Sequence, residues 1–217
     1  SPHVRSNEDT SYIMKQVIIA LVPAALAGLF YFRLNALSAM FFCILGTVGS
    51  EHIFCKIMKK KSTIGDFSAV VTGLLLAFNV PASLPWWMCL LGGIFAMVVV
   101  KMVFGGIGCN FVNPALAARA FLLASFPVAM TAWTKTGVNF VSSANLDAVS
   151  TATPLSFLKA GPAGLADLAA NNISLSDMFL GNTGGCIGET CALLVILGGV
   201  YLIYKGIISY VMPVAYI

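Results

Sequence analysis

The segment at residues 149–155 contains Thr153, a side chain well placed to carry a covalent group. A threonine hydroxyl is a poor nucleophile without a neighbouring base, and this segment contains no His, Cys or carboxylate to activate it. Ala152 leaves room beside the hydroxyl, and Pro154 favours an extended backbone at Thr153, which presents the side chain to an outside active site. The pattern indicates an acceptor that a separate enzyme modifies. For these residues alone, an ordinary Ser/Thr-rich turn is the alternative.

The elements that must position this threonine are apolar. Hydrophobic residues make up 59% of the 217 residues and charged residues only 9%, which indicates an integral membrane protein. A helix needs about 20 apolar residues to cross a bilayer. The sequence predicts six complete spans, at residues 13–32, 34–55, 67–80, 86–104, 114–130 and 186–204. The third is short, and we favour a span extended by Ile64 and Gly65 over a half-helix. Residues 207–217 are expected to be the start of a seventh span, so we expect residues 1–217 to form a single transmembrane domain that is incomplete at its C-terminal end.

Positive charges assign the two membrane sides, because short loops rich in Lys and Arg stay in the cytoplasm. With the N-terminus inside, nine basic residues lie at the inner side: Arg5, Lys15, Lys56, Lys59, Lys60, Lys61, Lys101, Arg119 and Lys205. Three lie outside: Arg33, Lys135 and Lys159. Residues 132–185 are therefore expected to form an extracytoplasmic loop that carries Thr153. The lysines at residues 56–61 are interpreted as a topology anchor, with binding of anionic lipid headgroups as the alternative.

A glycine-rich break separates the fourth and fifth expected spans. It contains Gly105, Gly106, Gly108, Asn110, Asn113 and Pro114. Pro114 suits the first turn of a helix, and Asn113 can cap that helix. Irregular backbone at membrane depth persists only where protein or an aqueous cavity satisfies its amides, which makes the break a usual place for a ligand. A capped re-entrant turn without a ligand is the alternative, and no strand precedes the glycines, so we reject a dinucleotide-binding loop.

Other polar residues are less informative. Arg119 is costly to expose to lipid and should face the protein interior, although a structural or snorkelling arginine is an alternative to a binding one. Glu51, His52 and Asp66 lie at expected span ends, where interface solvation or helix capping explains them. Glu189 is expected to open the sixth helix. The six cysteines show no spacing typical of a metal or iron–sulfur site, and a Cys186–Cys191 disulfide is a weak alternative to apolar packing.

The run Ser-Thr-Ala-Thr-Pro-Leu at residues 150–155 and the run Gly-x-Gly-x-Asn-Phe-x-Asn-Pro-Ala-Leu at residues 106–116 resemble the RnfD/NqrB family of membrane flavoproteins. The resemblance covers the whole chain and is closer to the RnfD branch. It implies that a flavin transferase esterifies FMN through its phosphate to Thr153. It also implies a second, noncovalent flavin, riboflavin, with Asn110 and Asn113 as polar contacts and Arg119 as a further candidate, and no metal ligand or catalytic side chain.

The resemblance also implies the fold and the setting. The fold would be an all-α, polytopic bundle that forms the first half of a urea-channel-like inverted repeat. The chain would be a subunit of the Rnf complex in a bacterial or archaeal cytoplasmic membrane, an ion-translocating oxidoreductase that relays electrons between ferredoxin and NAD while moving Na⁺ or H⁺. Its partners would include an FMN-carrying extracytoplasmic subunit and iron–sulfur membrane subunits. The net charge of +4 requires no nucleic acid.

Three alternatives stay open. The first is an NqrB-type subunit of a Na⁺-translocating NADH:quinone reductase. The second is a flavin-free transporter of urea-channel type, and the third is a purely structural assembly subunit. Hydropathy excludes none of them, but a flavinylated protein is yellow and a channel is colourless.

Overall fold

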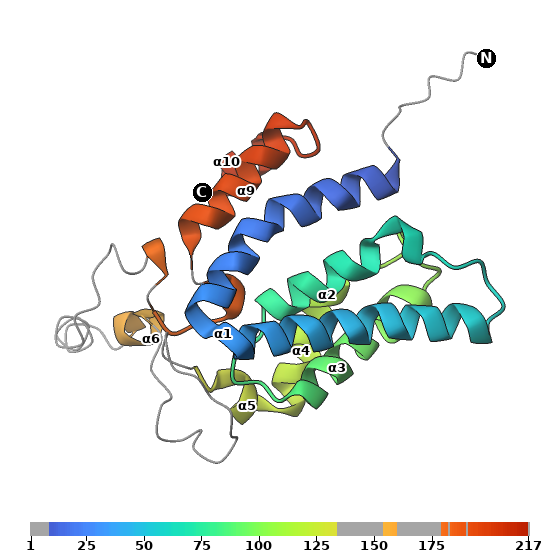
Figure 1. Ribbon diagram of the computed structural model, residues 1–217, viewed down its shortest axis with the longest axis horizontal. Coiled ribbons are helices and arrows are strands. Elements are labelled where there is room, and N and C mark those ends of the chain that lie inside the picture. The colour runs from blue at the N-terminus through green and yellow to red at the C-terminus, as the bar shows by residue number, and fades with distance from the viewer. Residues whose placement is uncertain (1–8, 134–153, 160–178, 182, 190, 217) are drawn as a thin grey trace.

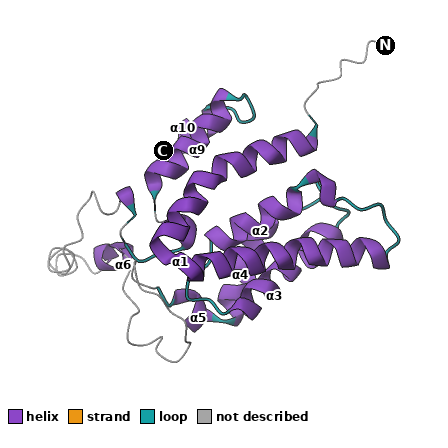
Figure 2. Ribbon diagram, in the orientation of Figure 1, coloured by secondary structure: helices purple, strands orange, loops and turns teal. Residues whose placement is uncertain are grey.

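The computed structural model describes residues 9–133, 154–159, 179–181, 183–189 and 191–216. Within these residues the secondary structure is helical, apart from an isolated β-bridge between Pro81 and Cys186 (Figure 2). The elements are α1 (Thr10–Ile57), η1 (Ile64–Asp66), α2 (Ser68–Phe78), α3 (Trp86–Phe95), the π-helix η2 (Ala96–Met102), α4 (Pro114–Ser125), α5 (Pro127–Thr131), α6 (Pro154–Lys159), η4 (Ile187–Glu189), α9 (Ala192–Tyr204) and α10 (Val211–Tyr216). The expected all-helical class is confirmed.

Helix α1 is a hairpin of two arms. Arg33 interrupts it with φ 50° and ψ −126°, a conformation outside the helical region, and the chain reverses there (Figure 1). The arms, residues 10–32 and 34–57, each extend roughly 35 Å at 1.5 Å per residue, enough to cross a hydrocarbon core of about 30 Å. Among the described residues, α1 is the helix long and apolar enough to cross a membrane. The expected boundary between the first two apolar segments is therefore confirmed.

Helix α2 is shorter than expected. It has 11 residues and is about 16 Å long, roughly half of a membrane crossing. Ile64 and Gly65 do not extend it, because they belong to the separate turn η1 and Phe67 takes a left-handed conformation, φ 61°, between the two. The expected extension is wrong, and the half-helix alternative describes α2 better. Asp66 caps the first turn: its Oδ1 accepts from the Ser68 backbone N–H at 2.8 Å.

Two later boundaries also differ. The fifth expected span is divided into α4 and α5 at Phe126, because Pro127 disfavours helical backbone at the residue before it. The sixth begins later than expected, since α9 starts at Ala192, whereas Glu189 belongs to the separate turn η4. The shorter apolar helices, including the continuous unit Trp86–Met102, have 10 to 17 residues. The count of six spans and the inverted repeat remain predictions.

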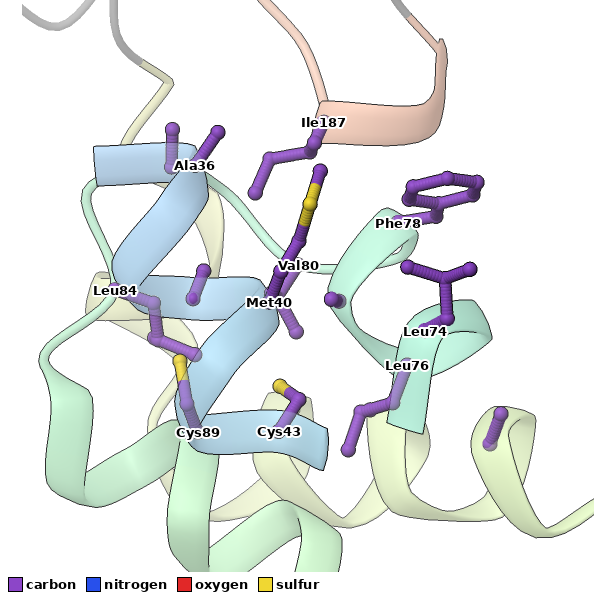
Figure 3. Close-up of a cluster of buried hydrophobic side chains, with 14 of the residues drawn as sticks. Ala36, Met40, Cys43, Leu74, Leu76, Phe78, Val80, Leu84, Cys89 and Ile187 are labelled. Atoms are coloured by element: carbon purple, nitrogen blue, oxygen red, sulfur yellow. The ribbon is translucent and has the colours of Figure 1, made fainter. Parts of the chain in front are cut away.

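The packed core lies among α1, α2, α3 and η4. Figure 3 shows Met40 of α1 extending toward Phe78 at the end of α2 and Ile187 of η4. Small residues allow the helix backbones to approach closely, as is usual in membrane bundles. A Cβ added at Gly93 of α3 would lie 2.8 Å from the Cys43 carbonyl oxygen of α1, and one added at Gly46 would lie 2.7 Å from the Leu90 carbonyl oxygen. The second arm of α1 and α3 are thus in backbone contact.

We expect Gly93→Val to destabilise the protein, because backbone atoms of α1 cannot move aside as a flexible side chain would. Overpacking of this kind typically costs about 1–3 kcal/mol. The thermal unfolding midpoint in detergent should fall clearly below that of the wild type. Gly199→Val on α9 is the matched control, since a Cβ there meets nothing within 4 Å. Equal midpoints for the two variants would contradict the close packing of α1 and α3.

Large apolar side chains also cover the outside of the bundle. Phe30 is 78% exposed, Leu34 66% and Phe41 58%, and all three lie on the α1 hairpin. Soluble proteins rarely expose large apolar side chains in contiguous patches, whereas lipid-facing helices carry them routinely. The exposed apolar surface agrees with the membrane location that composition predicts.

Candidate functional site

The glycine-rich break is present and depends on its glycines. Helical structure ends at Met102 and resumes at Pro114. Gly105, Gly106 and Gly108 have φ values of +116°, +102° and +82°, which residues with a Cβ rarely adopt. The Gly106 N–H donates to the Lys101 carbonyl at 3.0 Å, so the chain turns sharply as it leaves η2. The expected interruption between the fourth and fifth apolar segments is confirmed.

Asn113 caps α4, as expected. Its Oδ1 accepts from the backbone N–H groups of Ala115 at 3.0 Å and Leu116 at 3.4 Å, and Pro114 occupies the first helical position. The cap fixes the direction in which α4 leaves the break. Because the oxygen is used by the helix, the Nδ2 donors of this exposed side chain are what remains for a ligand.

Asn110 differs from Asn113 because its acceptor is unused. Its Oδ1 is buried and accepts no hydrogen bond from the described residues. A buried acceptor left without a donor costs about 1–3 kcal/mol. The break therefore contains a polar atom, Asn110 Oδ1, that suits the N–H or O–H donor of a bound molecule. The amide donors of Asn113 lie three residues further along the chain.

Arg119 faces the interior, as expected, but it does not point to the break. Its Nη1 donates to Asn79 Oδ1 at 3.0 Å, and its Nη2 lies 3.8 Å from Cys186 Sγ. Asn79 ends α2, and Cys186 precedes η4, where its Sγ lies 3.5 Å from the Asn79 carbonyl oxygen. Glu189 Oε2 accepts from the Cys186 backbone N–H at 3.4 Å. The arginine thus joins α4 to the ends of α2 and η4, apart from Asn110 and Asn113.

Cys186 and Cys191 are both free and buried, so the alternative of a disulfide between them is wrong. Cys186 lies in the β-bridge with Pro81, and Cys191 precedes α9. Their burial fits the expectation that most cysteines act as small apolar residues.

The structure contains a buried ion pair, Glu51 with Lys101, that the sequence did not predict. Glu51 is 0% exposed and Lys101 2%, so interface solvation does not explain Glu51. Lys101 Nζ lies 3.1 Å from Glu51 Oε1 and donates to Ser68 Oγ at 2.6 Å, while Thr63 Oγ1 donates to the same Glu51 oxygen at 2.5 Å. Glu51 Oε2 has no partner among the described residues. The pair connects the second arm of α1 to the π-helix η2 and the start of α2.

Thr153 itself lies outside the described residues, and α6 begins at the next residue, Pro154. Figure 1 shows α6 at the end of the bundle where α1 reverses direction, which is at Arg33. The glycine-rich break and the lysines at residues 56–61 lie at the opposite end, where the second arm of α1 finishes. Helix α6, which follows Thr153 in the chain, and the asparagine motif therefore lie at opposite ends of the helix bundle.

The chain matches the model of the NQR2, RnfD, RnfE family over residues 1–217. It is similar to the D subunit of the Na⁺-translocating ferredoxin:NAD⁺ oxidoreductase complex of Acetobacterium woodii, with 48% identity over 219 residues that cover 100% of the chain and 65% of that relative. Identity is 43% to the D subunit of the proton-translocating complex of Clostridium ljungdahlii, with the same coverage. Identity is 34% to the D subunit of the ion-translocating oxidoreductase complex of Rhodobacter capsulatus, over 99% of the chain and 65% of the relative. The chain spans about 65% of the length of each.

Proposed function

This chain belongs to the NQR2, RnfD, RnfE family, and from that premise we propose that it is the D-type membrane subunit of an ion-translocating ferredoxin:NAD⁺ oxidoreductase. The observation that carries the proposal is the 48% identity to a D-type subunit of such a complex across the whole chain. Two further D-type relatives, at 43% and 34% identity, favour this branch over an NqrB-type subunit. The family and the long apolar helix α1 indicate a membrane protein.

The finer proposal is that the chain holds two flavins. FMN is bound as a phosphoester to Thr153, outside the membrane, after a flavin transferase has acted. Riboflavin is bound at the glycine-rich break on the cytoplasmic side. When bound, these groups supply electron-carrying chemistry, and the protein supplies their positions. The position of α6, which starts at the residue after Thr153, at the bundle end opposite the glycine-rich break supports this arrangement of one carrier near each membrane face.

The residues at the break suit the second flavin. An isoalloxazine offers an imide N–H and two carbonyl oxygens, and its ribityl chain offers hydroxyl groups. Asn110 Oδ1, which has no hydrogen-bond partner among the described residues, suits one of these donors, and the Nδ2 donors of Asn113 suit an acceptor. Arg119 is left out of this contact set, since its guanidinium bonds to Asn79 at the end of α2. Its role is to hold α4 against α2 and η4.

We expect Asn110→Ala to weaken riboflavin binding about tenfold, because one hydrogen bond to a buried acceptor is lost. The measurement is the amount of flavin released by acid precipitation of the purified protein and separated by chromatography. Covalent flavin in the pellet should stay constant. Cys109→Ala is the control, since Cys109 is an exposed neighbour in the same break. Unchanged release from Asn110→Ala would remove this residue from the site.

The overall function is tested by purifying the protein through a tag on this chain from its own membrane. We expect a yellow complex that contains further subunits, including an FMN-carrying extracytoplasmic subunit and iron–sulfur subunits, and that reduces NAD⁺ with reduced ferredoxin. The same preparation in vesicles should build a Na⁺ or H⁺ gradient, and the removal of one ion at a time identifies which. A colourless protein that purifies alone and conducts a small solute would support the transporter alternative instead.

A further inference from the structure

An apolar groove of about 440 Å³ lies between the second arm of α1 and the continuous unit of α3 and η2. Residues four apart on facing helices line it: Gly49, Ile53 and Ile57 on α1, with Leu90, Ile94 and Val98 opposite. The polar residue in its wall is Ser50, whose hydroxyl donates to the Thr47 carbonyl at 3.1 Å. The Ser50 proton is therefore already used, and the rest of the lining offers apolar side chains and glycines to a ligand.

The groove is closed at one end and open at the other. Backbone contact between Gly46 and Leu90 closes it, whereas a Cβ added at Gly49 meets nothing within 4 Å. The groove therefore runs from Gly46 toward Ile57, over about 16 Å at 1.5 Å per residue. That length is close to the roughly 15 Å of hydrocarbon in one bilayer leaflet. Ile53 and Ile57, 58% and 72% exposed, leave the open side accessible from the bilayer.

Four lysines lie at the end of the second arm of α1, where the groove opens. Lys56, Lys59, Lys60 and Lys61 are exposed where the second arm of α1 finishes, next to Ile57. The ion pair in the described part of the chain is Glu51 with Lys101, so none of the four has an acidic partner there. The C-terminal end of a helix carries only about half a negative charge, which four ammonium groups outweigh. An apolar groove thus leads into an uncompensated cationic cluster.

We propose that this groove binds one acyl chain of an anionic phospholipid of the inner leaflet, with its phosphate group against the lysines at residues 56–61. A partner helix fits less well. A helix is 10–12 Å across, so 16 Å of it occupies about 1,300–1,800 Å³, roughly three to four times the groove volume. The cationic end matches the anionic lipids of a cytoplasmic leaflet. The lysines are thus one half of a lipid site as well as a topology signal. This site requires only that the chain lies in a membrane, so its test does not depend on whether the flavins are bound.

The first test fills the groove. The protein is purified from its membrane with the subunits that accompany it, and native mass spectrometry counts bound phosphatidylglycerol and phosphatidylcholine after each lipid is added in detergent. We expect Gly49→Leu to lower phosphatidylglycerol binding about tenfold, because its side chain occupies the space of the acyl chain. Gly199→Leu on α9 is the control, as its Cβ also meets nothing within 4 Å. Equal binding by both variants and the wild type would overturn the proposal.

The second test removes the charge. Lys60→Gln with Lys61→Gln should weaken phosphatidylglycerol binding about twenty-five-fold, at about a factor of five for each lysine, and leave phosphatidylcholine binding unchanged. Lys15→Gln with Lys205→Gln removes the same charge from the same membrane side and should have little effect. Equal losses in the two double variants would show that only net charge attracts the lipid, and the specific site would be wrong.

The occupant is identified with a photoreactive amino acid at Ile53, inside the groove. Illumination in the native membrane should yield a phospholipid adduct of this chain. A covalent product with another membrane subunit would show that a partner helix occupies the groove and would overturn the lipid proposal even if Gly49→Leu weakens lipid binding.

Discussion

Thr153→Ala is expected to abolish the covalent flavin of this chain. A denaturing gel under ultraviolet light should show a fluorescent band for the wild type and none for the variant, because the hydroxyl oxygen is the proposed point of attachment. The variant should still accumulate in the membrane and unfold at the wild-type temperature, since Thr153 belongs to none of the described helices. Electron transfer by the complex should fall to background, because one proposed carrier is missing.

Two neighbouring substitutions make this result specific. Thr151→Ala removes the other threonine of the segment and should leave the fluorescence intact. Thr153→Ser keeps a hydroxyl and should retain part of it, since the acceptor chemistry is unchanged. A fluorescent band from Thr153→Ala would rule out Thr153 as the acceptor, whereas loss in Thr151→Ala alone would move the attachment two residues upstream.

Glu51→Leu is expected to destabilise the protein by about 3–5 kcal/mol, the usual cost of leaving one member of a buried ion pair without its partner. Lys101 would keep its bond to Ser68 but lose the carboxylate that balances its charge at 2% exposure. The thermal unfolding midpoint in detergent should fall by many degrees, and the yield from membranes should fall with it. His52→Leu, at the exposed neighbouring position, should leave the midpoint close to the wild type.

The double variant Glu51→Leu with Lys101→Leu distinguishes charge from packing. It removes both charges, so most of the lost stability should return, as buried pairs can often be replaced by apolar residues at little cost. The coupling between the two substitutions should then be several kcal/mol. The single variant Lys101→Leu completes the comparison. If the double variant loses as much stability as the two single variants lose in sum, the two side chains do not interact in the folded protein.

Features that depend on local sequence could be predicted. The break in hydropathy between two apolar segments predicted the turn of α1 at Arg33. The glycines predicted the interruption before α4, and the Asn113-Pro114 pair predicted the N-cap of α4. The interior position of Arg119 followed from the cost of exposing a charge to lipid. In each case, neighbouring residues or a simple transfer cost determined the structure.

Features that depend on distant contacts could not be predicted. Glu51 and Lys101 are 50 residues apart, and only the packing of η2 on α1 brings them together. Two features of the sequence could have indicated the pair. Lys101 directly follows the apolar run at residues 98–100, and Glu51 lies near the end of another expected span. Hydropathy also overestimated the length of α2. Val80 and Pro81 are as buried as residues inside a helix, although they belong to the connection after α2 that pairs with the segment at Cys186 and η4. Burial by neighbours and burial by lipid produce the same apolar sequence.

The claim that this chain is a flavin-carrying membrane subunit is tested most directly by intact-mass measurement of the polypeptide purified from its own host, followed by peptide mapping. We expect one added mass, that of FMN less one water, on the peptide that contains residues 150–155 and localised to Thr153. An unmodified mass in a yellow preparation that carries out electron transfer, or the same added mass on a different residue, would contradict it.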